Sequence, residues 1–422
     1  MDVPILEIQC NILTLLIYSK IVIEYRPDSM EVGFYCSNKG KRTMIRVLIG
    51  GDVCPIGRNL VLFQDGEARL LFNDLLPVFE NADMKIVCLE CPLIRDLSTI
   101  KKMGPVLGVP TDVATGLKTA GIDVVNLANN HIMDHGPDGL LSTIEALRES
   151  GINHFGAGES MEKARRIWIR EIRGMRIGVI GLAEHEFGIA QKNKPGGNPL
   201  DVIDFVRNVK QHRSEFDYLI ALVHGNNELY QYPRPELIDT CRFLVEQGAN
   251  AVICQHSHCV GCMETYLGAP ILYGQGNLLF DMPAQPDIFY EGVLVSLNIK
   301  TASETHVELI PYRQSDGQPG AYRMSPVSEE KFLNELNNRS KSIGNESFVY
   351  EQWDIFCRKN KRFYLSMLHG KPNLLRRVLG KLDMLHYLDS PQTQRKRLHM
   401  IRCESLREGL LMVLSMEAER KE

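Results

Sequence analysis

The sequence contains no convincing export signal and no hydrophobic run long enough to cross a membrane. An apolar stretch near its start, residues 8–23, is interrupted by Gln9, Asn11, Ser19 and Lys20, and no small-residue cleavage site follows it. The same stretch is too short and too polar to span a bilayer comfortably. We therefore expect a cytoplasmic protein, peripheral to a membrane only where a partner recruits it.

A regular disulfide framework is also missing. The eleven cysteines are odd in number, and many free thiols indicate a reducing compartment. Two pairs, Cys88–Cys91 and Cys259–Cys262, have the spacing of zinc-binding thiols, but the pairs lie far apart in the sequence. We interpret them as small buried residues at strand ends, with a four-thiolate zinc site as the alternative.

Charge of one sign is not in large excess. The net charge of −4 predicts neither nucleic-acid nor anionic-membrane binding, so we expect no nucleic acid among the partners. The composition, 44% hydrophobic and 24% charged, is typical of a soluble globular protein. At 422 residues, the chain is longer than one compact domain usually needs.

Helices and strands alternate through the middle of the chain. Three predicted helices end on a glycine, Gly121, Gly151 or Gly248, and the chain then re-enters an extended segment. Short links of this kind predict an α/β layered sheet, with an antiparallel portion near its end. The predicted strands are 45–49, 84–89, 124–127, 177–180, 218–223, 251–253, 271–273, 293–299 and 306–311. The predicted helices of this part are 112–120, 140–147, 201–213 and 235–247.

Strand patterns stop near residue 320. The segments 329–336, 349–367, 373–388 and 392–416 are predicted to be helices, and prolines punctuate them. We therefore predict three parts: an N-terminal extension over 1–43, an α/β domain over 44–320 and a helical C-terminal region over 321–422.

Polar residues follow five of the predicted strands. They are Asp52, Glu90, Asn130 with His131, His224, and His256 with His258. Ligands gather at the carboxyl ends of strands in α/β sheets. Any one of these residues alone is better interpreted as a loop or capping residue. The two histidines of the H-x-H pair are different, since two imidazoles on one side of an extended segment are costly without a common partner.

Together, these residues suit a site for one or two divalent metals. Two carboxylates, an amide and three imidazoles could hold two ions if one carboxylate bridges them. The mixture of oxygen and nitrogen ligands favours Mn, Fe or Zn over Ca. His131 would then be spare and could protonate a leaving group.

The motifs around these residues resemble the bacterial capsule-synthesis CapA family, which includes the poly-γ-glutamate synthesis proteins. The resemblance covers roughly residues 44–312. It is carried by Gly51-Asp52-Val53, Leu89-Glu90-Cys91-Pro92-Leu93, Ala128-Asn129-Asn130-His131, Val223-His224-Gly225, His256-Ser257-His258-Cys259-Val260 and the closing segment 274–281.

The resemblance implies a four-layer α/β/β/α sandwich related to calcineurin-like metallophosphoesterases. It implies that His131 is the catalytic imidazole and that Arg58 lies near the substrate anion. The metal ligands that it implies are Asp52, Glu90, Asn130, His224, His256 and His258.

The function implied is that of a metal-dependent hydrolase in capsule or poly-γ-glutamate synthesis. Metal-bound hydroxide would attack a phosphoester or an amide, and the partners would be the polymer or its precursor and subunits of a synthase complex. The alternative is a non-catalytic accessory subunit that uses the same fold as a scaffold.

One departure from the metallophosphoesterase pattern concerns the first metal position. The usual opening Asp-x-His is here Asp52-Val53-Cys54. Residues two apart on an extended strand point the same way, so Cys54 could replace the missing histidine as a ligand. It could equally pack as a small apolar residue before Pro55.

Overall fold

The computed structural model describes residues 44–96, 98–102, 104–368 and 390–419. The predicted N-terminal extension and the predicted helix 373–388 lie outside the described residues. Within those residues, no helix combines the length and the apolar character that crossing a bilayer requires.

The first of two large sheets is mixed. Over the described residues it has eight strands, ordered β18-β17-β16-β1-β2-β5-β6, with β15 also paired to β1. Its parallel strands are β1 (Ile45–Cys54), β2 (Met84–Leu89), β5 (Val124–Asn126), β6 (Asn153–Phe155) and β15 (Asn277–Phe280). Its antiparallel strands are β16 (Glu291–Thr301), β17 (Glu304–Gln314) and β18 (Ala321–Arg323).

The second sheet has six strands among the described residues, in the order β13-β14-β12-β11-β9-β8. Its parallel centre is formed by β9 (Met175–Ala183), β11 (Tyr218–His224), β12 (Ala251–Gln255) and β14 (Ala269–Leu272). Its antiparallel edges are β8 (Trp168–Ile172) and β13 (Met263–Tyr266). Two short pairs lie outside both sheets: β3 (Leu93–Ile94) with β4 (Val109–Pro110), and β7 (Ala157–Gly158) with β10 (Gly196–Gly197).

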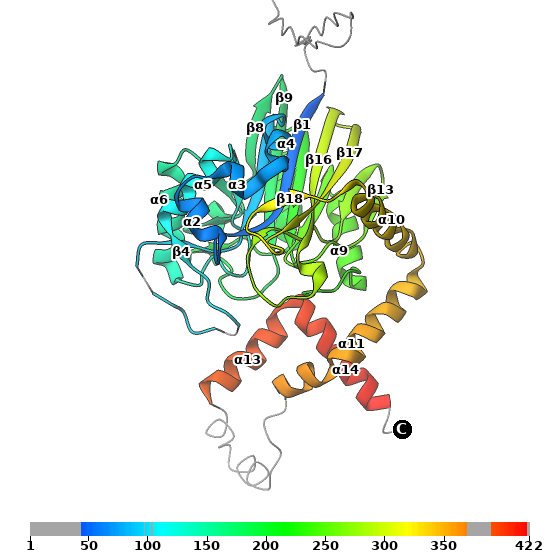
Figure 1. Cartoon of the computed structure of the whole chain (residues 1–422). Coiled ribbons are helices and arrows are strands. Elements are labelled where there is room, and N and C mark those ends of the chain that lie inside the picture. The colour runs from blue at the N-terminus through cyan, green and yellow to red at the C-terminus, as the bar shows by residue number, and fades with distance from the viewer. Residues whose placement is uncertain (1–43, 97, 103, 369–389, 420–422) are drawn as a thin grey trace, which may run out of the picture. The chain divides into compact units, whose positions relative to one another are not determined.

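Helices cover the outer face of each sheet (Figure 1). Leu48 of β1 packs in one apolar core with Phe63 and Leu117, and Leu219 of β11 packs in another with Leu237. The helices on the first sheet are α2 (Asn59–Gln64), α3 (Ala68–Phe72), α4 (Leu76–Glu80), α5 (Ala114–Thr119) and α6 (Gly136–Glu149). Those on the second are α8 (Val202–His212) and α9 (Pro235–Glu246), and the short α7 (Met161–Ala164) precedes β8.

The inner faces of the two sheets pack against each other. Ile49 and Ile220 are fully buried. Their sequence neighbours Leu48 and Leu219 face the helices, so Ile49 and Ile220 face the other sheet. Between the layers, the Asn126 side chain donates to Gln255 Oε1 at 3.3 Å, and Gln255 Nε2 donates to the carbonyl of Gly50 at 3.2 Å. The predicted four-layer α/β/β/α sandwich is therefore confirmed.

The repeated link from helix to strand has the predicted conformation. Gly121, Gly151 and Gly248 have φ angles of 73°, 67° and 113°, which glycine adopts without the steric penalty of a side chain. Each returns the chain from a helix to a strand in one turn. The parallel strands consequently all end at the same edge of their sheets, where polar residues can meet.

The C-terminal region is helical, but two details differ from the sequence prediction. Strand β18 continues the first sheet through Arg323, past the predicted boundary at 320. The predicted helix 392–416 is two helices, because Cys403 between them is extended, with φ −69° and ψ 123°. The helices described are α10 (Pro326–Ser342), α11 (Glu346–Leu368), α13 (Pro391–Arg402) and α14 (Glu404–Glu419). The division of the chain at residues 320 and 321 stays a prediction.

A buried ion-pair network joins these helices to the α/β layers. Arg234, at the start of α9, donates from Nη2 to Glu184 at 2.7 Å and pairs through Nε with Glu408 of α14. The other oxygen of Glu184 accepts from the backbone of Ser405 at 3.2 Å. Apolar contacts extend the same interface, since Tyr230 packs in one cluster with Trp353 and other residues of the helices.

We predict that Arg234→Met destabilises the protein by about 3–5 kcal/mol, because it leaves two buried carboxylates without their cation. The free energy of unfolding, measured by urea denaturation, tests this. Arg242→Met is the matched control, since it removes an ion pair with Glu264 that is only partly buried and should cost about 1 kcal/mol or less. Equal stability of wild type and Arg234→Met would contradict the prediction.

Candidate metal centre

The strand ends of both sheets bring the predicted ligands together. Asp52 lies in β1, opposite Cys88 of β2 and Asn277 of β15. Glu90 directly follows β2, and its backbone N–H donates to the carbonyl of Val53 at 2.9 Å. Both carboxylates are fully buried. They therefore lie at the inner edge of the sandwich and not on its surface.

The turn after β5 is shaped by its own asparagines. Asn126 accepts from the backbone N–H of Ala128 at 3.0 Å, and Asn129 accepts from that of His131 at 3.1 Å. Asn129 also donates to the carbonyl of Leu89 at 2.8 Å, which fixes the turn to the neighbouring strand exit. Asn129 therefore has a structural role, and Asn130 is left to face the cluster.

The sequence interpretation assumed that the H-x-H pair is extended, and the structure shows that it is not. His256 and His258 have φ angles of 85° and 51°, a backbone conformation that costs about 1–3 kcal/mol for a residue other than glycine. The backbone N–H of His256 donates to Asp52 Oδ2 at 3.0 Å and supports this conformation. The two imidazoles consequently point into two different groups of side chains.

The first group surrounds Nε2 of His224. Asn130 Oδ1, Glu90 Oε1 and His256 Nδ1 lie 3.1, 3.3 and 3.2 Å from this nitrogen. An amide oxygen, a carboxylate oxygen and two imidazole nitrogens are ligand atoms that a divalent transition metal accepts. Glu90, His224 and His256 are close enough to share one ion.

The second group contains Asp52, Glu90 and His258. His258 Nδ1 lies 3.9 Å from Asp52 Oδ2 and 3.9 Å from Glu90 Oε2. The same nitrogen is 2.8 Å from the side-chain oxygen of Asn277, which orients the ring. These three residues also could share one ion. Because Glu90 belongs to both groups, it occupies the place of a bridging carboxylate.

The carboxylate oxygens of this site lack the hydrogen bonds that burial usually demands. Asp52 Oδ1 and both oxygens of Glu90 are buried and have no hydrogen-bond partner among the described residues. Such oxygens are rare in folded proteins unless a cation or water completes them. The residues present therefore fit a divalent metal.

The electrostatics of the site reflect several charged groups in a dry environment. Burial and the neighbouring Glu90 raise the pKa of Asp52 to about 6. Burial opposes ionisation of Glu90, but His258 and His224 outweigh it and lower the pKa of Glu90 to about 2. Burial and His224 hold the pKa of His256 well below its usual value, so this imidazole keeps its lone pair. Burial also opposes protonation of His258, but Glu90 outweighs it and raises the pKa of His258 to about 9, so a metal would displace a proton there.

The structure does not bring Cys54 into the cluster. The residue is fully buried in the apolar core with Val53 and Cys91, and it belongs to none of the groups of side chains that could share an ion among the described residues. A different thiol, Cys88, lies near the cluster, with its Sγ 3.7 Å from His224 Nδ1.

Arg58 is likewise held apart from these groups. Its guanidinium donates to both oxygens of Asp281, at 3.0 and 2.8 Å, and to the carbonyls of Ser315 and Gly317. A substrate anion would have to compete with Asp281 for this side chain.

His131 is next to the cluster and has its own support. Its Nδ1 lies 2.7 Å from Asp134 Oδ2 and 3.2 Å from Lys102 Nζ. Lys102 also pairs with Asp134 at 2.5 Å. The imidazole is thus oriented through one nitrogen.

Sequence reasoning missed Glu186, which touches the first group. It follows β9, a strand predicted to end at Ile180 but observed to continue to Ala183. Burial, together with Glu228, raises the pKa of Glu186 to about 7. With a correct strand end, the same reasoning about strand exits would have found it. His399 of α13, which contacts Glu186, had no such signal.

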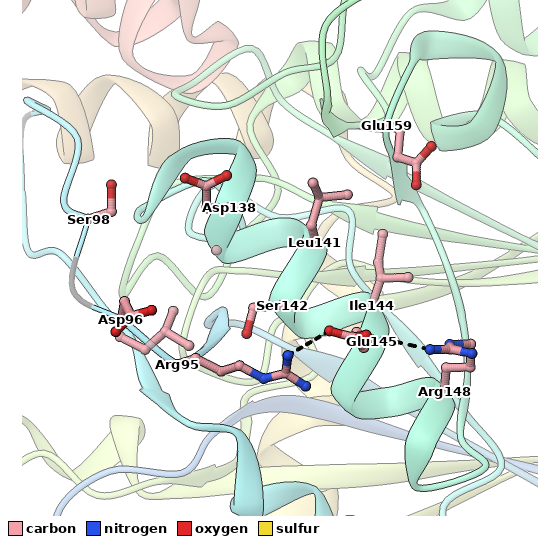
Figure 2. A pocket seen from close by; sticks show the side chains of 12 residues that line it. Arg95, Asp96, Ser98, Asp138, Leu141, Ser142, Ile144, Glu145, Arg148 and Glu159 are labelled. Carbon is pink, nitrogen blue, oxygen red and sulfur yellow. Dashed lines mark ion pairs between the residues drawn. The ribbon is translucent and has the colours of Figure 1, made fainter.

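A surface cavity of about 560 Å³ lies away from these residues, beside α6. Figure 2 shows Arg95 and Arg148 directed toward Glu145, and the nitrogen–oxygen distances are 2.8 and 3.6 Å. Three of its charged side chains therefore already pair with one another.

Comparison with known proteins matches residues 46–282, more than half of the chain, to the family model described as bacterial capsule synthesis protein PGA_cap. Relatives include the capsule biosynthesis protein CapA of Bacillus anthracis, 25% identical over 258 residues, which are 59% of this chain and 62% of that protein. A probable polyglutamine synthesis accessory protein of Mycobacterium tuberculosis is 28% identical over 240 residues, 53% of this chain and 61% of that protein. The chain thus spans about three-fifths of the length of these relatives.

Among solved structures, a putative 5'-nucleotidase from Staphylococcus aureus aligns with a TM-score of 0.42 at 14% identity, covering 70% of this chain and 58% of that chain. The family to which the chain is assigned does not depend on that structural similarity. It depends on the family match, which spans β1 through the segment after β15 and includes every residue of the two candidate groups. The chain belongs to the family of bacterial capsule synthesis proteins PGA_cap.

Proposed function

We propose that this protein is a metal-dependent hydrolase of capsule or poly-γ-glutamate synthesis, acting on a phosphoester or an amide of the polymer or its precursor. Family membership supports the pathway, and the names of the relatives point the same way. Subunits of a synthase complex are its proposed partners. Its proposed compartment is the cytoplasm, in keeping with the free thiols of all nine described cysteines.

The observation that carries the proposal is the set of three buried carboxylate oxygens without hydrogen bonds, on Asp52 and Glu90. Asn130, His224 and His256 would hold one ion with Glu90, and His258 would hold a second with Asp52 and Glu90. When bound, Mn, Fe or Zn supplies Lewis-acid chemistry, lowering the pKa of a water and offsetting charge on the substrate.

His131 is proposed as the proton donor to the leaving group. Asp134 and Lys102 both engage its Nδ1, so Nε2 is the atom that can hold or give a proton. The side chain is only 9% exposed, which excludes most water while keeping one edge accessible. An oriented imidazole of this kind typically contributes about 10²- to 10⁴-fold in rate.

A second candidate is the non-catalytic accessory role. One observation favours it: the group of Asp52, Glu90 and His258 has three ligand residues, and Cys54 does not add a fourth. Weak binding of the ion in this second group would leave a binding scaffold with one structural metal in the first group.

We predict that Glu90→Gln weakens Mn²⁺ binding at both groups, because its carboxylate is shared, whereas His258→Ala weakens it at one. Each loss should reach at least the roughly 10- to 100-fold effect typical of changes in the outer shell of a metal site. Calorimetric titration with Mn²⁺ measures the stoichiometry and affinity.

Cys54→Ser is the control for these variants. It should keep full metal content, since the thiol packs in the apolar core. Unchanged Mn²⁺ binding by Glu90→Gln would refute the shared site, and loss of an ion in Cys54→Ser would restore Cys54 as a ligand.

We predict that His131→Gln lowers hydrolysis of an aryl phosphodiester by about 10²- to 10⁴-fold while metal content stays at the wild-type level. His154→Gln, a substitution of a partly buried histidine in β6, should leave the rate unchanged. A metal-loaded wild type that hydrolyses neither phosphoesters nor amides would favour the accessory role instead.

A further inference from the structure

Three consecutive residues after β9 contact the C-terminal helices. Glu184 accepts from the backbone of Ser405, and the backbone N–H of His185 donates to Glu404 at 2.7 Å. Glu186 lies 3.7 Å from Nε2 of His399. The segment therefore docks the helices, which lie beyond the family-matched residues 46–282.

Glu186 also faces two of the proposed metal ligands. Its Oε1 lies 3.5 Å from His256 Nε2, and its Oε2 accepts from Asn130 Nδ2 at 3.3 Å. The side chain is 13% exposed, so water screens these contacts only weakly. One carboxylate thus connects two ligands of the same group.

Asn130 and His256 are oriented so that one end of each side chain faces the ligand group and the other end faces Glu186. Asn130 Oδ1 and His256 Nδ1 point toward His224 Nε2, at 3.1 and 3.2 Å. The opposite atom of each side chain, Nδ2 or Nε2, faces Glu186. A metal-binding histidine usually donates its second N–H to a carboxylate, which fixes the ring and raises its basicity.

His399 is itself held in place. The ring of Phe187 stacks on it at 4.4 Å between centroids, with an angle of 21° between the planes. Lys102, the residue that contacts His131, lies 5.5 Å from the centre of the Phe187 ring. The C-terminal helices therefore reach the surroundings of both the ligand group and the proposed proton donor.

We propose that Glu186 is a positioning residue that orients His256 and Asn130 toward the metal, and that His399 of the C-terminal helices holds Glu186 in this position. The inference rests on the proposed function, because it assumes that the first group binds an ion. It makes the helical region a part of the metal site and not merely an appendage.

The test measures Mn²⁺ affinity of the full chain by calorimetric titration, in the wild type and in a His258→Ala background that isolates the first group. Glu186→Ala should lower the affinity of this group about 10- to 100-fold. Glu186→Gln should recover most of the loss, since an amide oxygen can still face Nε2 of His256. His399→Ala should produce a smaller loss in the same direction.

His185→Ala is the matched control, because it breaks a neighbouring contact with the helices, to Glu404, without touching a ligand. Its Mn²⁺ affinity should equal that of the parent. Parental affinity in Glu186→Ala, or an equal loss in His185→Ala and His399→Ala, would overturn the proposal while leaving the proposed metal site intact. A wild type that binds no Mn²⁺ would overturn both.

Discussion

Asp52 and Glu90 carry two carboxylates into a part of the protein that excludes water, where an uncompensated charge is strongly destabilising. The surrounding structure compensates them with imidazoles. His224 and His256 come from the second sheet and face Glu90, and His258 faces both carboxylates. Three carboxylate oxygens nevertheless keep no hydrogen bond. Without a cation, this arrangement lowers the stability of the fold, whereas it suits the binding of a cation. Side chains that lower stability in this way are typical of functional sites.

Much of this arrangement could be predicted from local patterns. Apolar runs located β2 at Met84–Leu89 and the centre of β11, and glycine after a helix indicated the returns to the sheet. Since parallel strands end at one edge, a polar residue directly after an apolar run is already placed near others of its kind. Glu90 and His224 satisfy that rule directly, and Asp52 and Asn130 stand three residues beyond their apolar runs. The structure brings all four side chains together.

Other features depend on contacts that no local pattern encodes. The left-handed backbone of His256 is supported by Asp52, which is 204 positions away in the chain. Cys54 packs in an apolar core built from several distant segments, and an apolar run does not reveal which neighbours a residue will pack against. Glu186 was missed for a simpler reason, because β9 continues past the glycine at position 181 that made the run look shorter. His399 lies in a basic, weakly patterned helix whose partner could be known only from the folded chain.

The segment Glu184-His185-Glu186 shows how stability and the site are linked in this fold. Glu184 shares the buried Arg234 with Glu408, so the position of α14 depends on the conformation at the end of β9. Glu186, two residues later, contacts both His256 and Asn130. Glu184 and Glu186 thus both contact the C-terminal helices from one short length of backbone. The helical region thus bears on the geometry of the ligand group even though it supplies none of the ligands.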